Sequence, residues 1–178
     1  MDASQPARMK LECRRAPRPG RTLRHPTRYS YGSAAAIVTS VGLIVGFGAA
    51  SLSRAAILSG LLIIALADNL SDSLSIHIYQ ESENLEASAA FAATVTNFVA
   101  RLLVALSFVG IVLTIPEPAA PIIATVWGLL LLATLTYALS RVRHVPPWRE
   151  IGKHVVVAIV VVATSRMLGG WIAVHVAS

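Results

Sequence analysis

The segment AAAIVTSVGLIVGFGAASL, residues 34–52, has no charged side chain and is long enough to cross the hydrocarbon core of a bilayer as a helix. Apolar stretches of comparable length follow it at about residues 55–79, 88–114, 121–140 and 154–176. None of them alternates between apolar and polar residues as a membrane-spanning strand does. The sequence therefore predicts an all-α integral membrane protein with five transmembrane helices.

The composition favours the same class. Of 178 residues, 55% are hydrophobic and only 13% are charged, whereas about a quarter of the residues in a soluble domain are charged. A disordered chain would combine low hydrophobicity with high net charge, so that class is excluded as well. The single cysteine, Cys13, cannot form an intrachain disulfide.

Residues 1–32 differ in composition from the rest of the chain. They hold eight Lys or Arg residues, four prolines and only two acids. We expect a disordered basic tail that lies near anionic lipid headgroups, followed by one transmembrane domain at residues 33–178. A nucleic-acid partner is not expected, because the basic residues are explained by membrane topology.

The positive charges predict the orientation. Four cations between the fourth and fifth apolar stretches lie on the same side as the tail: Arg141, Arg143, Arg149 and Lys153. The other side holds only Arg54. By the positive-inside rule the N-terminus is cytoplasmic and the C-terminus is on the opposite side. The predicted location is multi-pass, in a bacterial or archaeal inner membrane or in an organelle membrane.

Ionisable residues inside a membrane span are costly, so each is a functional candidate. The apolar stretches contain Asp68, Asp72, Arg101 and Arg166. On a helix, a stripe of polar side chains would run from inside the membrane to its cytoplasmic edge. Its members are Asp68, Asp72, Ser75, Tyr79, Glu83 and Glu86, with Glu81 off the stripe.

Carboxylate and hydroxyl oxygens suit divalent cations such as Mn²⁺ and Fe²⁺. The predicted metal ligands are Asp68, Asp72, Glu81, Glu83 and Glu86. The predicted supporting or gating residues are Asn69, Ser75, His77, Asn97, Arg101 and Arg166. His77 points away from the stripe, which favours a packing role. The carboxylates could also carry protons, because burial raises the pKa of a carboxyl group. These features predict a proton-coupled cation carrier.

Two alternatives use the same residues. Asp68 or Asp72 could pair with Arg101 or Arg166 in a structural network, so that the protein is a non-transporting membrane scaffold. The acids could instead form a pathway for protons or monovalent ions. An enzyme is not predicted, because the sequence has no Gly-rich phosphate loop, no Ser-His-Asp arrangement and no Cys/His cluster. No permanently bound cofactor is expected, and the metal would be the transported substrate.

The segment Tyr31–Ser40, with Gly42 and Gly46 after it, resembles the first helix of the vacuolar iron transporter family. The junction Ser53–Ala55 and the polar, glutamate-bearing end of the second stretch are also similar to that family. The resemblance covers about residues 29–176. It implies a five-helix homodimer that moves Fe²⁺ or Mn²⁺ out of the cytoplasm in exchange for protons, for metal homeostasis.

The chain departs from the family at three places. The family has Asp-Gly in its first helix, where this chain has Ala35-Ala36. The family's second helix carries a Met and a Gly-Glu-Tyr, and the corresponding region here is Asn69–Ser75. The glutamate-rich insert of many eukaryotic members is reduced to a link of about residues 80–87. We expect Asp68 and Asp72 to replace the missing carboxylates in a minimal, divergent relative.

Overall fold

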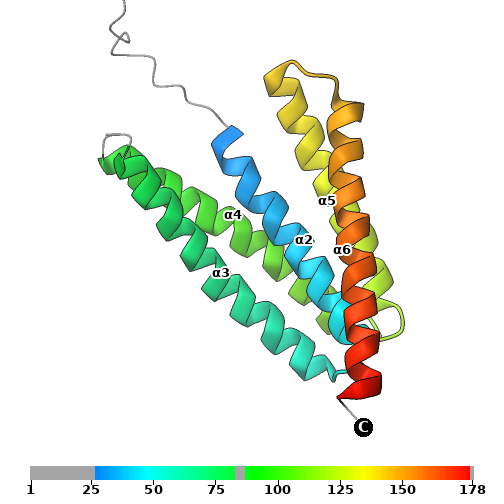
Figure 1. Cartoon of the computed structure of the whole chain (residues 1–178). Coiled ribbons are helices and arrows are strands. Elements are labelled where there is room, and N and C mark those ends of the chain that lie inside the picture. Colours follow the sequence, from blue (N-terminus) through cyan, green and yellow to red (C-terminus); the bar gives the residue numbers. More distant parts are fainter. Residues whose placement is uncertain (1–26, 83–86, 177–178) are drawn as a thin grey trace, which may run out of the picture.

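The computed structural model describes residues 27–82 and 87–176 (Figure 1). This part of the chain is helical and contains no strand. Its helices are α2 (Thr27–Ala49), α3 (Arg54–Ser82), α4 (Ala87–Thr114), α5 (Ala120–Arg143) and α6 (Pro147–His175). All five are long and apolar enough to cross a membrane, which confirms the predicted fold class. The bilayer is the environment that suits their apolar outer surfaces.

Two helices begin earlier than the apolar stretches predict. Helix α2 begins at Thr27, whereas the sequence predicted a span from residue 34, and residues 1–26 of the predicted tail lie outside the described residues. Helix α6 begins at Pro147 instead of residue 154. Proline is favoured in the first turn of a helix, because its missing N–H would have no partner there. Part of the predicted basic loop is therefore the first two turns of α6.

Helix α2 is the centre of the bundle. It contacts all four other helices, whereas α3 contacts only α2 and α4, and α6 contacts only α2 and α5. Figure 1 shows α2 between an α3–α4 pair and an α5–α6 pair. Half of the apolar span of α2 is buried, against 11% for α6. A change at α2 therefore affects both halves of the bundle.

Close packing around α2 forms the core. Ile37, Val41 and Ile44 of α2 pack with Phe108 of α4 and Leu132 of α5. Phe108 and Ile44 are fully buried. Lipid tails are as apolar as these side chains, so van der Waals packing holds the helices together better than the hydrophobic effect does.

Small residues bring α2 and α6 into backbone contact. A Cβ atom built on Gly169 of α6 would collide with the carbonyl oxygen of Gly46 in α2 and lie 3.0 Å from the Cβ of Ala49. A Cβ on Gly46 would lie 3.3 Å from the carbonyl oxygen of Ser165. Small residues at such positions let membrane helices approach closely.

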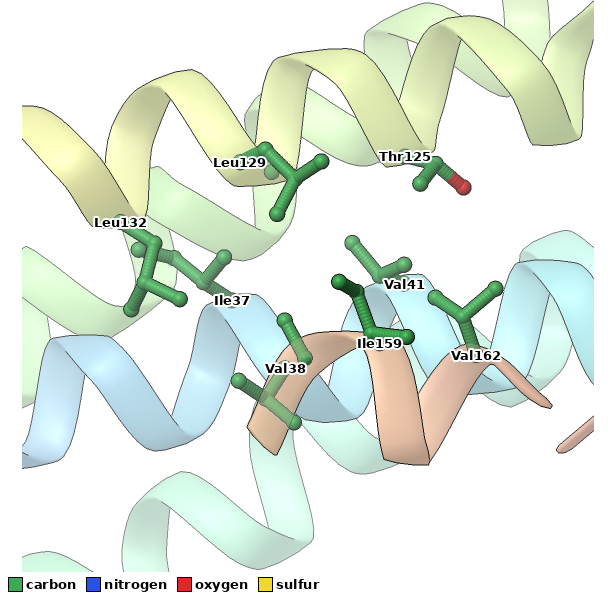
Figure 2. Close-up of a pocket in the computed structure, with 10 residues that line it drawn as sticks. Ile37, Val38, Val41, Thr125, Leu129, Leu132, Ile159 and Val162 are labelled. Carbon is green, nitrogen blue, oxygen red and sulfur yellow. The ribbon is translucent and has the colours of Figure 1, made fainter. Parts of the chain in front are cut away.

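A cavity of about 90 Å³ lies between α2, α5 and α6. Figure 2 shows that its labelled side chains are apolar except for Thr125. The Thr125 hydroxyl donates to the carbonyl of Pro121 at 2.7 Å, so its hydrogen is already used. Apolar cavities of this kind stay dry. The α5–α6 side therefore offers no polar chemistry at this depth.

The contact between α2 and α6 predicts a difference between two adjacent glycines. Gly169→Ala should lower the free energy of unfolding by about 1–3 kcal/mol, the usual cost of overpacking, because its methyl group would meet the α2 backbone. Thermal unfolding of the purified protein in detergent measures this.

Gly170→Ala is the matched control, because a Cβ there has no neighbour within 4 Å. It should leave the melting temperature unchanged or raise it slightly. Equal melting temperatures for the two variants would contradict the packing shown for α2 and α6.

Candidate functional site

Three charged side chains meet halfway along the helices. Asp68 stands at the middle of α3, Asp72 one turn further on, and Arg101 near the middle of α4. This level is inside the apolar spans of α3 and α4, and on α2 it is at Gly32, where the apolar span begins. At the centre of a membrane helix, an Asp or Arg costs about 2.5–3.5 kcal/mol on insertion scales. Such groups persist there only with partners.

Arg101 forms hydrogen bonds with both carboxylates of this cluster. Its Nη2 donates to Oδ2 of Asp68 and its Nη1 to Oδ2 of Asp72, both at 2.6 Å. Nη1 also donates to the carbonyl oxygen of Gly32 in α2 at 2.8 Å. The guanidinium therefore joins three helices, and we call Asp68, Asp72 and Arg101 the triad.

Burial within the triad is unequal. The Arg101 side chain is only 3% exposed, whereas those of Asp68 and Asp72 are 49% and 45% exposed. The guanidinium is thus inside the bundle, and the carboxylates lie at its outer surface. Each copy of the triad carries a net charge of −1, because two carboxylates face one guanidinium.

Several buried polar atoms around the triad have no hydrogen-bond partner among the described residues. They are Oδ1 and Nδ2 of Asn97, Nε of Arg101, Oδ1 of Asn69 and Oγ of Ser73. A buried polar group without a partner costs about 1–3 kcal/mol. A complete structural network would satisfy these atoms. The cavity beside Asp68, Asn69 and Arg101 has a volume of about 10 Å³, which is the space of about one water molecule.

Gly32 is required by this packing. A Cβ atom at this position would collide with Oδ1 of Asn97 and lie 3.1 Å from Cδ of Arg101. Glycine allows the α2 backbone to approach α4 so closely that its carbonyl accepts from Arg101. Asn97 is 1% exposed and fills the space beside this carbonyl.

The structure brings together some of the predicted site residues. Asp68, Asp72, Asn97 and Arg101 gather at the α3–α4 contact, with Asn69 donating to the carbonyl of Phe98 at 2.9 Å. His77 is partly buried. The hydroxyl of Ser75 donates to the carbonyl of Ser71 at 2.9 Å, so its hydrogen is not free for the triad.

Other predicted residues are not part of this cluster. Arg166 lies on α6, which does not contact α3, so it cannot pair with Asp68 or Asp72. Glu83 and Glu86, and the side chain of Glu81, lie outside the described residues. Within the described ranges, no three His, Cys, Asp or Glu side chains lie close enough together to hold a metal ion.

The backbone acceptor at Gly32 was missed by sequence reasoning. A carbonyl oxygen leaves no signal in the sequence, and Gly32 appeared only at the end of the predicted tail and in the segment Tyr31–Ser40, with no role assigned to it. The one available signal was the small-residue run at residues 32–36, which is typical of a helix that another helix approaches closely.

Comparisons with family models, with curated proteins and with solved structures find no match to this chain.

The triad predicts a non-additive loss of stability. Asp68→Asn or Asp72→Asn alone leaves one carboxylate on Arg101 and should cost little. The double variant leaves a buried guanidinium without a counter-charge, and breaking a buried ion pair in this way costs about 3–5 kcal/mol. Thermal unfolding of the three variants in detergent measures the interaction energy between the two positions.

Glu117→Gln is the control, because this exposed loop carboxylate has no ion-pair partner in the described part of the chain. It should unfold like the wild type. A double variant that loses no more than the sum of the two single variants would contradict the shared role of Arg101.

Proposed function

We propose that the protein is a homodimeric carrier that moves a divalent transition-metal cation, Fe²⁺ or Mn²⁺, out of the cytoplasm in exchange for protons, for metal homeostasis. The observation that carries this proposal is the triad: a net-negative group within the apolar spans of α3 and α4, with two half-exposed carboxylates. Intramembrane carboxylates of this kind mark ion and proton pathways.

The exposure of the carboxylates supports a second copy of the chain. Asp68 and Asp72 lie at the outer surface of α3, where a single copy would present them to lipid. The bilayer core has no water to solvate a carboxylate, so a covering partner is needed. Two α3 helices facing each other would remove both pairs of carboxylates from the lipid.

The net charge of such a pair suits a divalent cation. Two copies of the triad carry a charge of −2, which one Fe²⁺ or Mn²⁺ ion neutralises. Four carboxylates then supply oxygen ligands of the type that these cations accept. One copy alone offers too few ligands.

Arg101 has a defined role in this mechanism. In the empty carrier Arg101 bonds to both carboxylates, so that they always have a counter-charge. When the cation enters, the carboxylates turn outward to it, and the guanidinium keeps its bond to the carbonyl of Gly32. After release, protons or Arg101 neutralise the carboxylates again. The unpartnered polar atoms of Asn97 and Ser73 would bind water during these steps.

In the sequence, Glu81, Glu83 and Glu86 follow the triad at and after Ser82, the predicted cytoplasmic end of α3. They would attract cations to the entrance, because an acidic mouth raises the local cation concentration. The resemblance to the vacuolar iron transporter family supports the same direction of transport.

Removing all three charges tests the carrier without leaving a buried charge. Asp68→Asn/Asp72→Asn/Arg101→Met should fold, since replacing a buried ionic triad as a whole is often neutral or stabilising. In proteoliposomes its Mn²⁺ flux should fall to the level of empty liposomes, because the net-negative site is gone.

Glu117→Gln should retain the wild-type flux in the same assay, because this residue is exposed in the α4–α5 connection. Wild-type flux through a folded triad-free variant would contradict the proposal.

The second candidate function is a membrane scaffold that transports nothing. The observation in its favour is that both carboxylates already bond to Arg101 at 2.6 Å. It differs from the carrier in its response to metal. A ligand that binds the native state raises the free energy of unfolding, by about 2.7 kcal/mol at one hundred times its Kd. Stabilisation by Mn²⁺ or Fe²⁺ that is lost in the triad-free variant favours the carrier, and no stabilisation favours the scaffold.

The dimer predicts a cross-link along α3. Ser71, which stands between Asp68 and Asp72 in the sequence, is exposed on this helix next to Asp68. In a Cys13→Ser background, Ser71→Cys should form a disulfide-linked dimer on mild oxidation, because a disulfide joins Cα atoms about 4.4–6.8 Å apart. Gel electrophoresis without reductant measures the dimer yield.

Val160→Cys on the exposed face of α6 is the matched control and should form no disulfide-linked dimer. Equal cross-linking at the two positions would exclude a specific α3–α3 interface.

A further inference from the structure

A second polar site lies at the end of the bundle where α2 meets α3 and α4 meets α5, which we call the opposite end (Figure 1). It is a cavity of about 740 Å³, within the range of about 300–1,000 Å³ that ligand pockets occupy. The ends of α2, α3, α4 and α5 and the side of α6 form its walls. Three ionisable residues line it: Arg54, Glu117 and Arg166.

Arg54 is held in place at this cavity. Its Nη2 donates to the carbonyl oxygen of Ile115 at 3.1 Å and its Nη1 to that of Leu113 at 3.4 Å. These contacts satisfy carbonyl groups at the end of α4, which have no partner within the helix. They leave Nε of Arg54 and further N–H bonds for a ligand.

Arg166 has no hydrogen-bond or ion-pair partner within residues 27–82 and 87–176. It is exposed, and its neighbour Ser165 packs on Gly46, about one turn before α2 ends at Ala49. An Arg at a helix level this close to the lipid headgroups directs its charged end toward them. The cavity therefore contains a guanidinium that lacks a counter-ion.

The walls of the cavity are apolar on the side of the membrane interior. Ile44, Val45, Ile57 and Val112 line it there. Both guanidinium groups belong to the same cavity, which has a net charge of +1 when Glu117 is counted. Charged groups beside an apolar wall suit an amphiphile with an anionic head.

We propose that this cavity binds the phosphate group of a membrane phospholipid from the leaflet at the opposite end. Arg166 and Arg54 bind the phosphate oxygens, since planar guanidinium groups match phosphate geometry and keep their charge in apolar surroundings. The glycerol and the start of the acyl chains lie against Ile44 and Val112. Glu117 reduces the positive charge and so weakens binding.

The cavity is separate from the triad. Arg101 precedes Ile115 by about 21 Å along α4, at 1.5 Å per residue. The two sites also have opposite charge, so they attract opposite ligands. The lipid site therefore does not depend on the proposed transport function.

Binding of lipid to the full chain in delipidated detergent tests the proposal. Phosphatidylglycerol should raise the melting temperature of the wild type, and diacylglycerol with the same chains should not, because it lacks the phosphate. Arg166→Gln should weaken the apparent affinity for phosphatidylglycerol about tenfold, as expected for the loss of one charge-assisted hydrogen bond.

Two further variants sharpen the test. Arg141→Gln removes an exposed cation at the other end of the bundle and should bind like the wild type. Glu117→Gln should bind more tightly. An equal response of Arg166→Gln and the wild type to phosphatidylglycerol would overturn the proposal. So would inorganic phosphate that reproduces the full stabilisation with the same dependence on Arg166, since the ligand would then be a free anion.

Discussion

The contact between the Arg101 guanidinium and its three acceptors constrains the whole α2–α3–α4 half of the molecule. A guanidinium buried inside a bundle of membrane-spanning helices must be neutralised, and the carboxylates of Asp68 and Asp72 do this from α3. The Gly32 carbonyl adds a third acceptor from α2. Rotating α3 or α4 would separate the charges, and rotating α2 would remove the carbonyl acceptor, so these contacts fix the orientation of the three helices about their axes.

In a single copy of the chain, this arrangement leaves both carboxylates exposed and the charge of the triad unbalanced. The guanidinium is inside the bundle, but the carboxylates remain half exposed at its outer surface, and one negative charge is left over. A purely structural ion pair would have balanced charge and neighbours with satisfied hydrogen bonds. The side-chain polar atoms of Asn97 and Ser73 also have no hydrogen-bond partner among the described residues. A single copy of the chain therefore lacks groups that would balance this charge and satisfy these atoms. This is why we favour a partner copy and a cation.

The fold could be predicted from the sequence, but the site only in part. Five apolar stretches of membrane length determine the fold class, because a helix in lipid must satisfy its own backbone. The helical period placed Asp68 and Asp72 on one face, and Asn97 and Arg101 on another. The period gives no rotation of one helix against its neighbours, so it did not distinguish Arg101 from Arg166 as the partner. That choice depends on α3 packing against α4 and not against α6.

The charges also limit the path that a cation can take. A cation that left the triad through the bundle toward the opposite end would enter a cavity with two guanidinium groups, Arg54 and Arg166. Like charges repel strongly where the dielectric constant is low. At the middle of the bundle the α5–α6 side has an apolar cavity (Figure 2). The polar cavity on that side, which Glu150 and His154 line, lies near the α5–α6 connection. The remaining route is along the outer surface of α3, where Asp68, Asp72 and the exposed Ser71 lie. This surface is closed from lipid only when another helix covers it, so transport and dimer formation would depend on the same face of α3.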